Sequence, residues 1–271
     1  PMTPQEMWRQ FTDKQIPYEA WPFGAAADEL AALTLAGIKR ATSSAQAVYE
    51  KEGARIPQAG DYSVILDSHG DAVCIIRTAQ VEILPYCKIT AEQAALEGEG
   101  DLSLDYWRSV HEPFFTAELA ACGLEFSEDT PVVFERFEKV WPPEPENRYP
   151  WADEYLLSLP GATKDFKAEW GWTRYQVGGK MFAAVCAPGA EHKLFGGHKL
   201  LTLKCDPALS ELLRSEYAEI LPGFYMDKRC WISVLLDGGV SDELLRDLCR
   251  KSHALVFEKL TKKAQREILQ G

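Results

Sequence analysis

The chain has 271 residues, of which 46% are hydrophobic and 26% are charged. This composition is typical of a globular protein and excludes a disordered or fibrous one, and the length favours two domains over a single core. No apolar run approaches the roughly 18 residues that a membrane span needs, and no signal-like segment opens the chain. We therefore expect a cytoplasmic protein with no membrane partner.

The formal charge of −12 comes entirely from the first half of the chain. Residues 1–142 contain 11 Lys and Arg against 23 Asp and Glu, whereas the remainder is balanced. An acidic domain repels the phosphates that approach it, which disfavours long, non-specific binding to nucleic acid. A nucleoside or a short exposed RNA element fits this charge better.

The chain shows no pattern for a metal or cofactor site. Its seven cysteines are scattered and form no C-x-x-C pair, which favours reduced thiols over disulfides or a zinc ribbon. His192 and His198 have no partner at metal-ligand spacing. We expect neither a metal nor a cofactor.

A proline-rich segment divides the chain. Residues 141–150 contain four prolines, which remove backbone donors and fix φ, so the segment is predicted to be a stiff extended connector. We therefore predict an N-terminal domain at 1–145 and a C-terminal domain at 146–271.

Short helices and strands are expected to alternate in the first domain. Gly37 is a helix-ending residue, Thr90 and Gln93 form a capping box, and Ser68 to Asp71 have the composition of a hairpin turn. Helices are predicted at 28–36, at 91–97 and through Trp107 to Gly123 with an interruption at Pro113; strands are predicted at 64–67, 72–77, 81–84 and 131–137. This order favours a small barrel.

Two separated motifs in this domain contain the residues that could take part in catalysis or binding. Gly37 to Thr42 has the pattern Gly-x-Lys-x-x-Thr and supplies an amine and a hydroxyl, and Glu97 to Arg108 supplies carboxylates and aromatic rings. These motifs, with Trp21 to Gly24, Pro57-x-x-Gly60-Asp61 and Phe134 to Phe137, resemble in order and identity the ASCH domain, a barrel related to the PUA fold.

The resemblance covers about residues 21–141 and implies RNA binding and, in some members, ribonuclease activity or hydrolysis of the N4-acetylcytidine amide. Carried over residue by residue, it implies a catalytic triad of Lys39, Thr42 and Glu97. Glu99 and Asp101 stand close enough in sequence to replace Glu97. Candidate substrate contacts are Arg40, Ser103, Trp107 and Arg108.

The same residues permit a definite chemistry. A threonine hydroxyl becomes a nucleophile when a neutral lysine takes its proton; Arg40 would favour the neutral form of Lys39, and Glu97 would orient the lysine or activate water. On a regular strand, positions three apart face opposite sides, so Lys39 and Thr42 converge only if the segment turns or bulges. The alternative is structural: Lys39 bonds the last helix carbonyls, the acidic run is a solvated helix start, and Trp107 belongs to the core.

In the second domain we predict a helix, a hairpin, a strand, a helix, a strand and a final helix. Gly178-Gly179 is the two-residue hairpin turn, and Asp206-Pro207 begins a helix. The helices are expected at 153–159, 206–217 and 241–259, and the strands at 171–177, 180–185, 200–204 and 230–236. A helix pair on an antiparallel sheet is the expected packing.

This half is similar to the MmcQ/YjbR family, a frataxin-like two-layer α/β sandwich, over about residues 150–269. The motifs that carry the likeness include Leu159 to Thr163, Val177 to Phe182 and Pro222 to Trp231. The family is described as carrying a double-wing DNA-binding motif, for which Lys180, Lys204, Lys228 and Arg229 would form a basic face and Trp172 and Trp231 would stack. The zero net charge favours an interaction or accessory role instead.

The sequence thus predicts an α+β protein, with a PUA-like β-barrel followed by a frataxin-like sandwich. We expect the first domain to bind RNA or a modified nucleoside, with hydrolysis of RNA or of the N4-acetylcytidine amide through Lys39, Thr42 and Glu97. The alternative is a non-enzymatic adaptor in which the first domain reads RNA and the second docks DNA or a protein.

Overall fold

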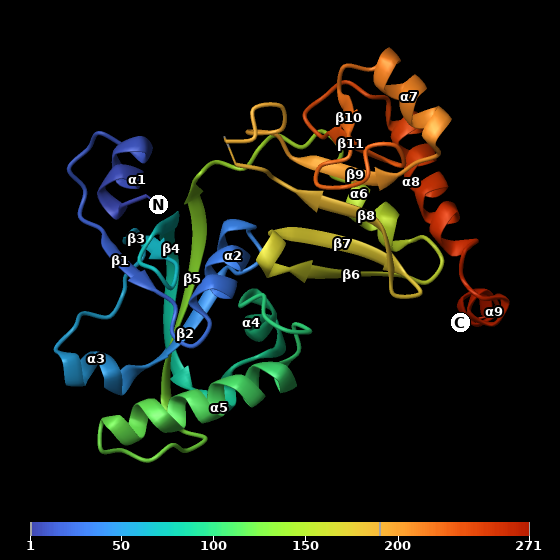
Figure 1. Cartoon of the computed structure of the whole chain (residues 1–271). Helices are drawn as coiled ribbons and strands as arrows, with labels where there is room; N and C mark the ends of the chain where they lie inside the picture. The colour runs from blue at the N-terminus through green and yellow to red at the C-terminus, as the bar shows by residue number, and fades with distance from the viewer. Residues whose placement is uncertain (1, 190, 271) are drawn as a thin grey trace. The chain divides into compact units, whose positions relative to one another are not determined.

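The computed structural model describes residues 2–189 and 191–270 (Figure 1). The chain forms two compact units, residues 1–143 and residues 144–271. Within the described residues, no helix is long and apolar enough to cross a membrane.

The N-terminal unit is built around one curled five-stranded sheet of order β1-β3-β4-β5-β2. β1 pairs with β3 in parallel, and the other strand pairs are antiparallel. Its elements are α1 (Pro4–Phe11), β1 (Glu19–Pro22), α2 (Ala27–Leu35), β2 (Ala41–Ala45), α3 (Gln46–Glu52), β3 (Tyr62–Leu66), β4 (Ala72–Pro85), the 3₁₀ turn η1 (Tyr86–Lys88), α4 (Ala91–Leu96), α5 (Leu104–Ala121) and β5 (Pro131–Trp141).

The curl of this sheet comes from its long central strands. The register between β4 and β5 shifts between Ile75 and Ile76 and again between Thr78 and Gln80. Such irregularities bend a strand without ending it. The strands predicted at 72–77 and 81–84 are therefore one strand, and the predicted hairpin between β3 and β4 is confirmed.

The predicted interruption of the helix at Pro113 is wrong, because α5 is continuous from Leu104 to Ala121. Its buried residues are Trp107, His111, Phe115 and Leu119, which recur every four positions and hold one face of the helix against the core. Pro113 lies on the exposed side, so the carbonyl that it leaves without a helical partner faces solvent.

The C-terminal unit is a six-stranded antiparallel sheet of order β10-β11-β9-β8-β7-β6 with helices against it, which confirms the predicted α+β sandwich. Gly178 and Gly179 have φ values of 56° and 71°, as the predicted turn requires. The elements are α6 (Ala152–Leu157), β6 (Ala162–Lys167), η2 (Ala168–Trp170), β7 (Trp172–Val177), β8 (Lys180–Cys186), β9 (Leu200–Lys204), α7 (Pro207–Glu216), β10 (Ile220–Pro222), β11 (Trp231–Leu235), α8 (Asp242–Phe257) and α9 (Lys262–Gln270).

The two faces of this second sheet are covered differently. One face packs against α6 and α8 in the main core, which includes Leu156, Leu203 and Leu248. The other face carries a smaller cluster in which Trp172 and Leu200 pack against Phe224, a loop residue. Loops rather than helices therefore close the second face.

Candidate functional site

Lys39 is a buried lysine that follows the end of α2. The helix ends at Leu35, Gly37 adopts a positive φ of 72°, and the N–H groups of Ile38 and Lys39 both donate to the carbonyl of Leu33, at 2.9 and 3.1 Å. The backbone N–H of Lys39 thus helps to terminate the helix, but its ammonium bonds Glu97 and Glu99 rather than the helix carbonyls that the structural alternative required. Its side chain is only 1% exposed and points into the unit.

The second motif lies directly against this turn. Arg40 N–H donates to the carbonyl of Leu96 at 2.8 Å, at the end of α4. Gly98 has a φ of +73°, and a Cβ at this position would lie 2.7 Å from the carbonyl oxygen of Ile38. Only glycine permits this close approach of the two backbones, so Gly98 brings Glu97 and Glu99 to Lys39.

The Lys39 ammonium lies between two carboxylates and an aromatic ring. Nζ is 3.2 Å from Glu97 Oε2 and 2.6 Å from Glu99 Oε1, and it lies 5.2 Å from the centroid of the Phe23 ring. The Glu97 side chain is 1% exposed and that of Glu99 is 15% exposed. Glu99 therefore lies on the side of the cluster that is nearest to solvent.

Glu97 is held by three further side chains. Its Oε1 accepts hydrogen bonds from Ser43 Oγ at 2.6 Å and from Trp107 Nε1 at 2.7 Å. Its Oε2 lies 3.5 Å from His111 Nε2. His111 stacks on Trp107 one helical turn earlier, with ring centroids 4.2 Å apart, and its Nδ1 lies 2.9 Å from the Trp107 carbonyl oxygen. We call Lys39, Ser43, Glu97, Glu99, Trp107 and His111 the Glu97 cluster.

The electrostatics of the cluster favour charged groups. Burial alone would raise the pKa of Glu97, but Lys39, His111 and the Ser43 hydroxyl outweigh it and lower the pKa to about 2. Burial would lower the pKa of His111, but its hydrogen bond and attraction to Glu97 raise it. The cluster is thus a fixed arrangement of an ionised Glu97 carboxylate beside Lys39 and His111, suited to binding a polar ligand or stabilising charge.

Thr42 lies on the other face of β2. Side chains alternate along a strand, and its neighbour Ser43 reaches Glu97. Thr42 pairs instead with Glu135 of β5, so these two side chains share the opposite face. The segment does not bring Thr42 to Lys39, and Ser43, which sequence reasoning missed, is the hydroxyl bonded to Glu97. The alternation of β2 was the signal that could have identified it.

Glu135 is a second buried glutamate. Its carboxylate accepts a hydrogen bond from Thr78 Oγ1 at 2.5 Å. Burial raises its pKa, and repulsion from Asp61 and Glu19 adds to this effect, while the Thr78 hydroxyl opposes it. Glu135 is therefore a carboxyl group that holds its proton more tightly than an ordinary glutamate does.

The other residues predicted at this site take different positions. Trp107 is buried and bonded to Glu97, whereas Arg40 is exposed. Ser103 caps α5 by accepting from Tyr106 N–H. Arg108 lines a shallow groove along α5 with Glu112 and Thr116, rather than the Glu97 cluster.

The predicted basic residues of the second unit lie at one end of its sheet. Lys180 begins β8, Lys204 ends β9 opposite Trp231, and Lys228 and Arg229 precede β11. Lys180, Lys228 and Arg229 are exposed, and Arg229 pairs with Asp227 at 3.4 Å. Trp172 and Trp231 are buried, so neither ring is free to stack on a base.

One group with metal-ligating atoms occurs in the described part of the chain. Ligand atoms of Asp28, Asp67 and His69 lie within 4.8 Å of one another at the surface. Both oxygens of Asp28 already accept hydrogen bonds from Ser68, one from its backbone N–H and one from its hydroxyl. These bonds account for the group as an ordinary hairpin turn.

Comparisons with known families match both units. A family model described as ASCH domain matches residues 19–141, and a model described as YjbR matches residues 157–255. The uncharacterized protein YbdF of Escherichia coli is 36% identical over 97 residues, which cover 36% of this chain and 74% of that protein. The uncharacterized protein YjbR of Escherichia coli is 26% identical over 117 residues, or 43% of this chain and 93% of that protein.

Two solved structures are similar to half of the chain. The ASCH domain from Lactobacillus crispatus is 32% identical and covers 50% of this chain and 92% of its own, with a TM-score of 0.47. A protein from Enterococcus faecalis is 36% identical and covers 50% of this chain and 86% of its own, with a TM-score of 0.46.

Proposed function

Residues 19–141 belong to the ASCH domain family and residues 157–255 to the YjbR family, and on this basis we propose that the N-terminal unit binds RNA or a modified nucleoside at the Glu97 cluster. The observation that carries the proposal is the burial of Lys39, Glu97 and His111 together, with Glu99 at the solvent side. Burying charges costs several kcal/mol per ion by general estimates, and groups with shifted pKa values concentrate at functional sites.

The solvent side of the cluster suits a nucleobase. The ring of Tyr106 is 37% exposed and packs on Gly100, where a Cβ would lie 2.5 Å from ring atoms. In our proposal a base stacks on Tyr106 and donates an N–H to Glu99, while Lys39 holds that carboxylate in place. The acidic charge of this half of the chain supports a nucleoside or short RNA rather than a long strand.

Hydrolysis of RNA or of the N4-acetylcytidine amide is the second candidate. The 2.6 Å bond between Ser43 Oγ and Glu97 favours it, because it places a hydroxyl beside a carboxylate and a lysine. The Lys39 ammonium is engaged by both Glu97 and Glu99, and a lysine that acts as a base must give up the proton that these ion pairs use. Binding is therefore the better supported function.

The test is product and binding analysis of the full chain with N4-acetylcytidine and, separately, with a mixed RNA. The variants are Lys39→Met, Ser43→Ala and Thr42→Val, with Lys88→Met as a control at an exposed lysine of the same unit. RNA or nucleoside binding that Lys39→Met weakens and Lys88→Met does not supports the proposal. Deacetylation or RNA cleavage lost in Ser43→Ala or Thr42→Val would identify a hydrolase and its hydroxyl. Equal binding by all variants would exclude the Glu97 cluster as the site.

A further inference from the structure

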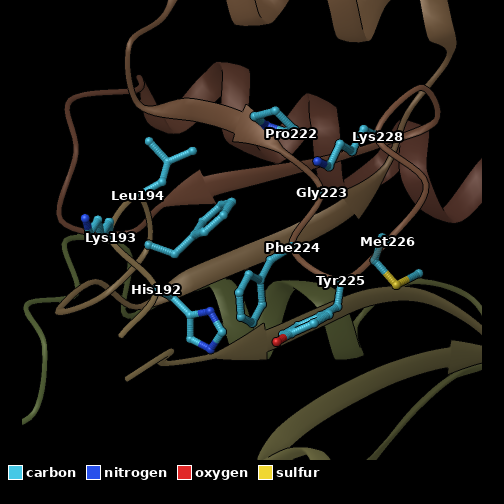
Figure 2. Close-up of a pocket in the computed structure, with 10 residues that line it drawn as sticks. His192, Lys193, Leu194, Pro222, Gly223, Phe224, Tyr225, Met226 and Lys228 are labelled. Carbon is cyan, nitrogen blue, oxygen red and sulfur yellow. The ribbon is translucent and has the colours of Figure 1, made fainter. Parts of the chain in front are cut away.

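The C-terminal unit has a pocket on the sheet face that loops cover (Figure 2). Its volume is about 420 Å³, within the range of small-ligand sites. It is formed by two loop segments, one before β9 and one between β10 and β11, and is lined by His192, Lys193, Leu194, Phe195, Pro222, Gly223, Phe224, Tyr225, Met226 and Lys228.

Aromatic rings form one side of this pocket. Phe224 is 7% exposed and contacts the ring of Phe195 at a centroid distance of 4.9 Å. Tyr225, the next residue, is 77% exposed and lies 4.6 Å from the Phe224 ring. The His192 ring is nearly perpendicular to both rings, at centroid distances of 5.0 and 5.7 Å. The exposed ring of Tyr225 thus packs beside the buried ring of Phe224.

The loop that presents Tyr225 is fixed. Gly223 N–H donates to the Trp231 carbonyl at 2.9 Å, and Phe224 N–H donates to Ser233 Oγ at 3.0 Å. A Cβ at Gly223 would lie 2.6 Å from Trp231 Cβ, so the loop packs directly on β11. Tyr225 itself has a φ of +50°, a conformation that is unfavourable for a tyrosine and that is often kept at binding sites. The exposed ring is therefore held in place.

The charge of the lining is positive. Its charged side chains are Lys193 and Lys228, and none of the lining residues is a carboxylate. Figure 2 shows the two lysines flanking the aromatic rings. Neither ammonium forms an ion pair with another residue in the described ranges 2–189 and 191–270. The pocket is complementary to a ligand that is both planar and anionic.

We propose that this pocket binds a nucleobase together with its phosphate. The base stacks on Tyr225 beside Phe224 and His192, and Lys193 and Lys228 both attract the phosphate. Stacking on an aromatic side chain combined with a nearby cation is the usual way in which proteins hold single nucleotides and unpaired strands. The buried tryptophans Trp172 and Trp231 have no part in this site. It is separate from the Glu97 cluster and from the function proposed for the N-terminal unit.

The test measures binding of uridine and adenosine monophosphates and of a fluorescent oligouridylate to the full chain. Tyr225→Gly removes the ring and suits the positive φ, so the loop keeps its conformation. We expect it to weaken binding roughly 5- to 150-fold, as loss of one stacked base does. Tyr225→Trp should retain binding. Lys228→Ala should weaken binding several-fold and reduce its salt dependence, whereas Lys263→Ala on α9 should change nothing.

Each variant is also measured with Lys39→Met, which separates this pocket from the N-terminal site. A Tyr225→Gly effect of the same size in both backgrounds supports the proposal whether or not the Glu97 cluster binds RNA. An effect on the monophosphates identifies a free nucleotide as the ligand, and an effect on the oligouridylate alone identifies an unpaired strand. The proposal is overturned if the wild-type chain binds none of these probes or if Tyr225→Gly binds them all equally well.

Discussion

Two glutamates of the N-terminal unit, Glu97 and Glu135, are almost equally buried and yet have opposite pKa shifts. Glu97 is 1% exposed and Glu135 is 5% exposed. Around Glu97 are a lysine, a histidine and two neutral donors, and its pKa is lowered to about 2. Around Glu135 are one hydroxyl and two acids, and its pKa is raised. For a buried carboxyl group, the neighbouring groups therefore decide the direction of the pKa shift, because burial removes the water that would otherwise screen their charges.

The boundary between these environments is strand β2. Ser43 faces Glu97, while Thr42, one residue earlier, is paired with Glu135. A shift of one residue in the register of β2 would exchange the two hydroxyls and place Thr42 with Glu97. Glu97 and Glu135 thus lie on opposite faces of strand β2.

The largest expected effect comes from Glu97→Gln. This change removes a charge that Lys39 and His111 both contact, and breaking a buried ion pair typically costs about 3–5 kcal/mol of stability. Urea unfolding at neutral pH measures the loss. Glu92→Gln, at an exposed position of α4, is the control and should change little. A loss below about 1 kcal/mol would show that the cluster does not hold the unit together.

The second prediction concerns the loss of stability at acid pH. The folded pKa of Glu97 is about 2 and its ordinary value is 4.5, so its contribution to stability is complete above about pH 4.5 and is lost as the pH falls towards 2. The contribution is about 3 kcal/mol. The stability difference between wild type and Glu97→Gln, measured by urea unfolding from neutral to acid pH, should shrink over that interval. A constant difference would contradict the lowered pKa.

A smaller effect separates the two hydroxyls of β2. Ser43→Ala removes a hydrogen bond to a buried charge and should cost about 2 kcal/mol, as such bonds generally do. Thr42→Val keeps the shape of the side chain and leaves Glu97 untouched, so we expect less than about 0.5 kcal/mol. Thermal or urea unfolding of both variants gives the comparison. If Thr42→Val were the more destabilising, the face assignment of β2 would be wrong.

The smallest expected effect is a gain in stability, from the change Glu135→Gln. Because the folded pKa of Glu135 is raised, the folded state binds its proton more tightly, and wild-type stability falls as the pH rises from about 4.5 through the folded pKa. Glu135→Gln still accepts from Thr78 and carries no charge, so it should gain about 1 kcal/mol at neutral pH. The gain should disappear near pH 4, which the same unfolding series would detect. Destabilisation at neutral pH would instead show that the charged form is needed.

Local signals in the sequence predicted much of the fold. The capping box of Thr90 and Gln93 and the turn at Gly178-Gly179 are both present. Each depends on residues within three or four positions, which is why sequence alone identifies it. Pro113 was misleading, since the fixed burial of α5 outweighs a single lost hydrogen bond on its exposed side. The edge strands β1, β2, β6 and β10 and the helices α1, α3 and α9 carry weaker patterns and were missed.

The site depends on contacts that no local pattern contains. Lys39 and Glu97 are 58 positions apart, and their approach requires the positive φ of Gly98 against the Ile38 backbone. Their pairing was suggested by family resemblance, not by spacing. Which hydroxyl joins them follows from the pairing of β2 with β5, which only the folded sheet defines.

The position of β2 in the sheet also orders events during synthesis of the chain. Among the residues that the structure describes, β2 is an edge strand that pairs with β5, the last strand of the N-terminal unit. While the polypeptide emerges from the ribosome, residues 41–45 have no strand to pair with until residues 132–136 have followed them. Helix α2 and the turn that bears Lys39 can form early, but Ser43 reaches its place only when the unit is complete. A nascent chain can therefore complete this site only after β5 has been synthesised.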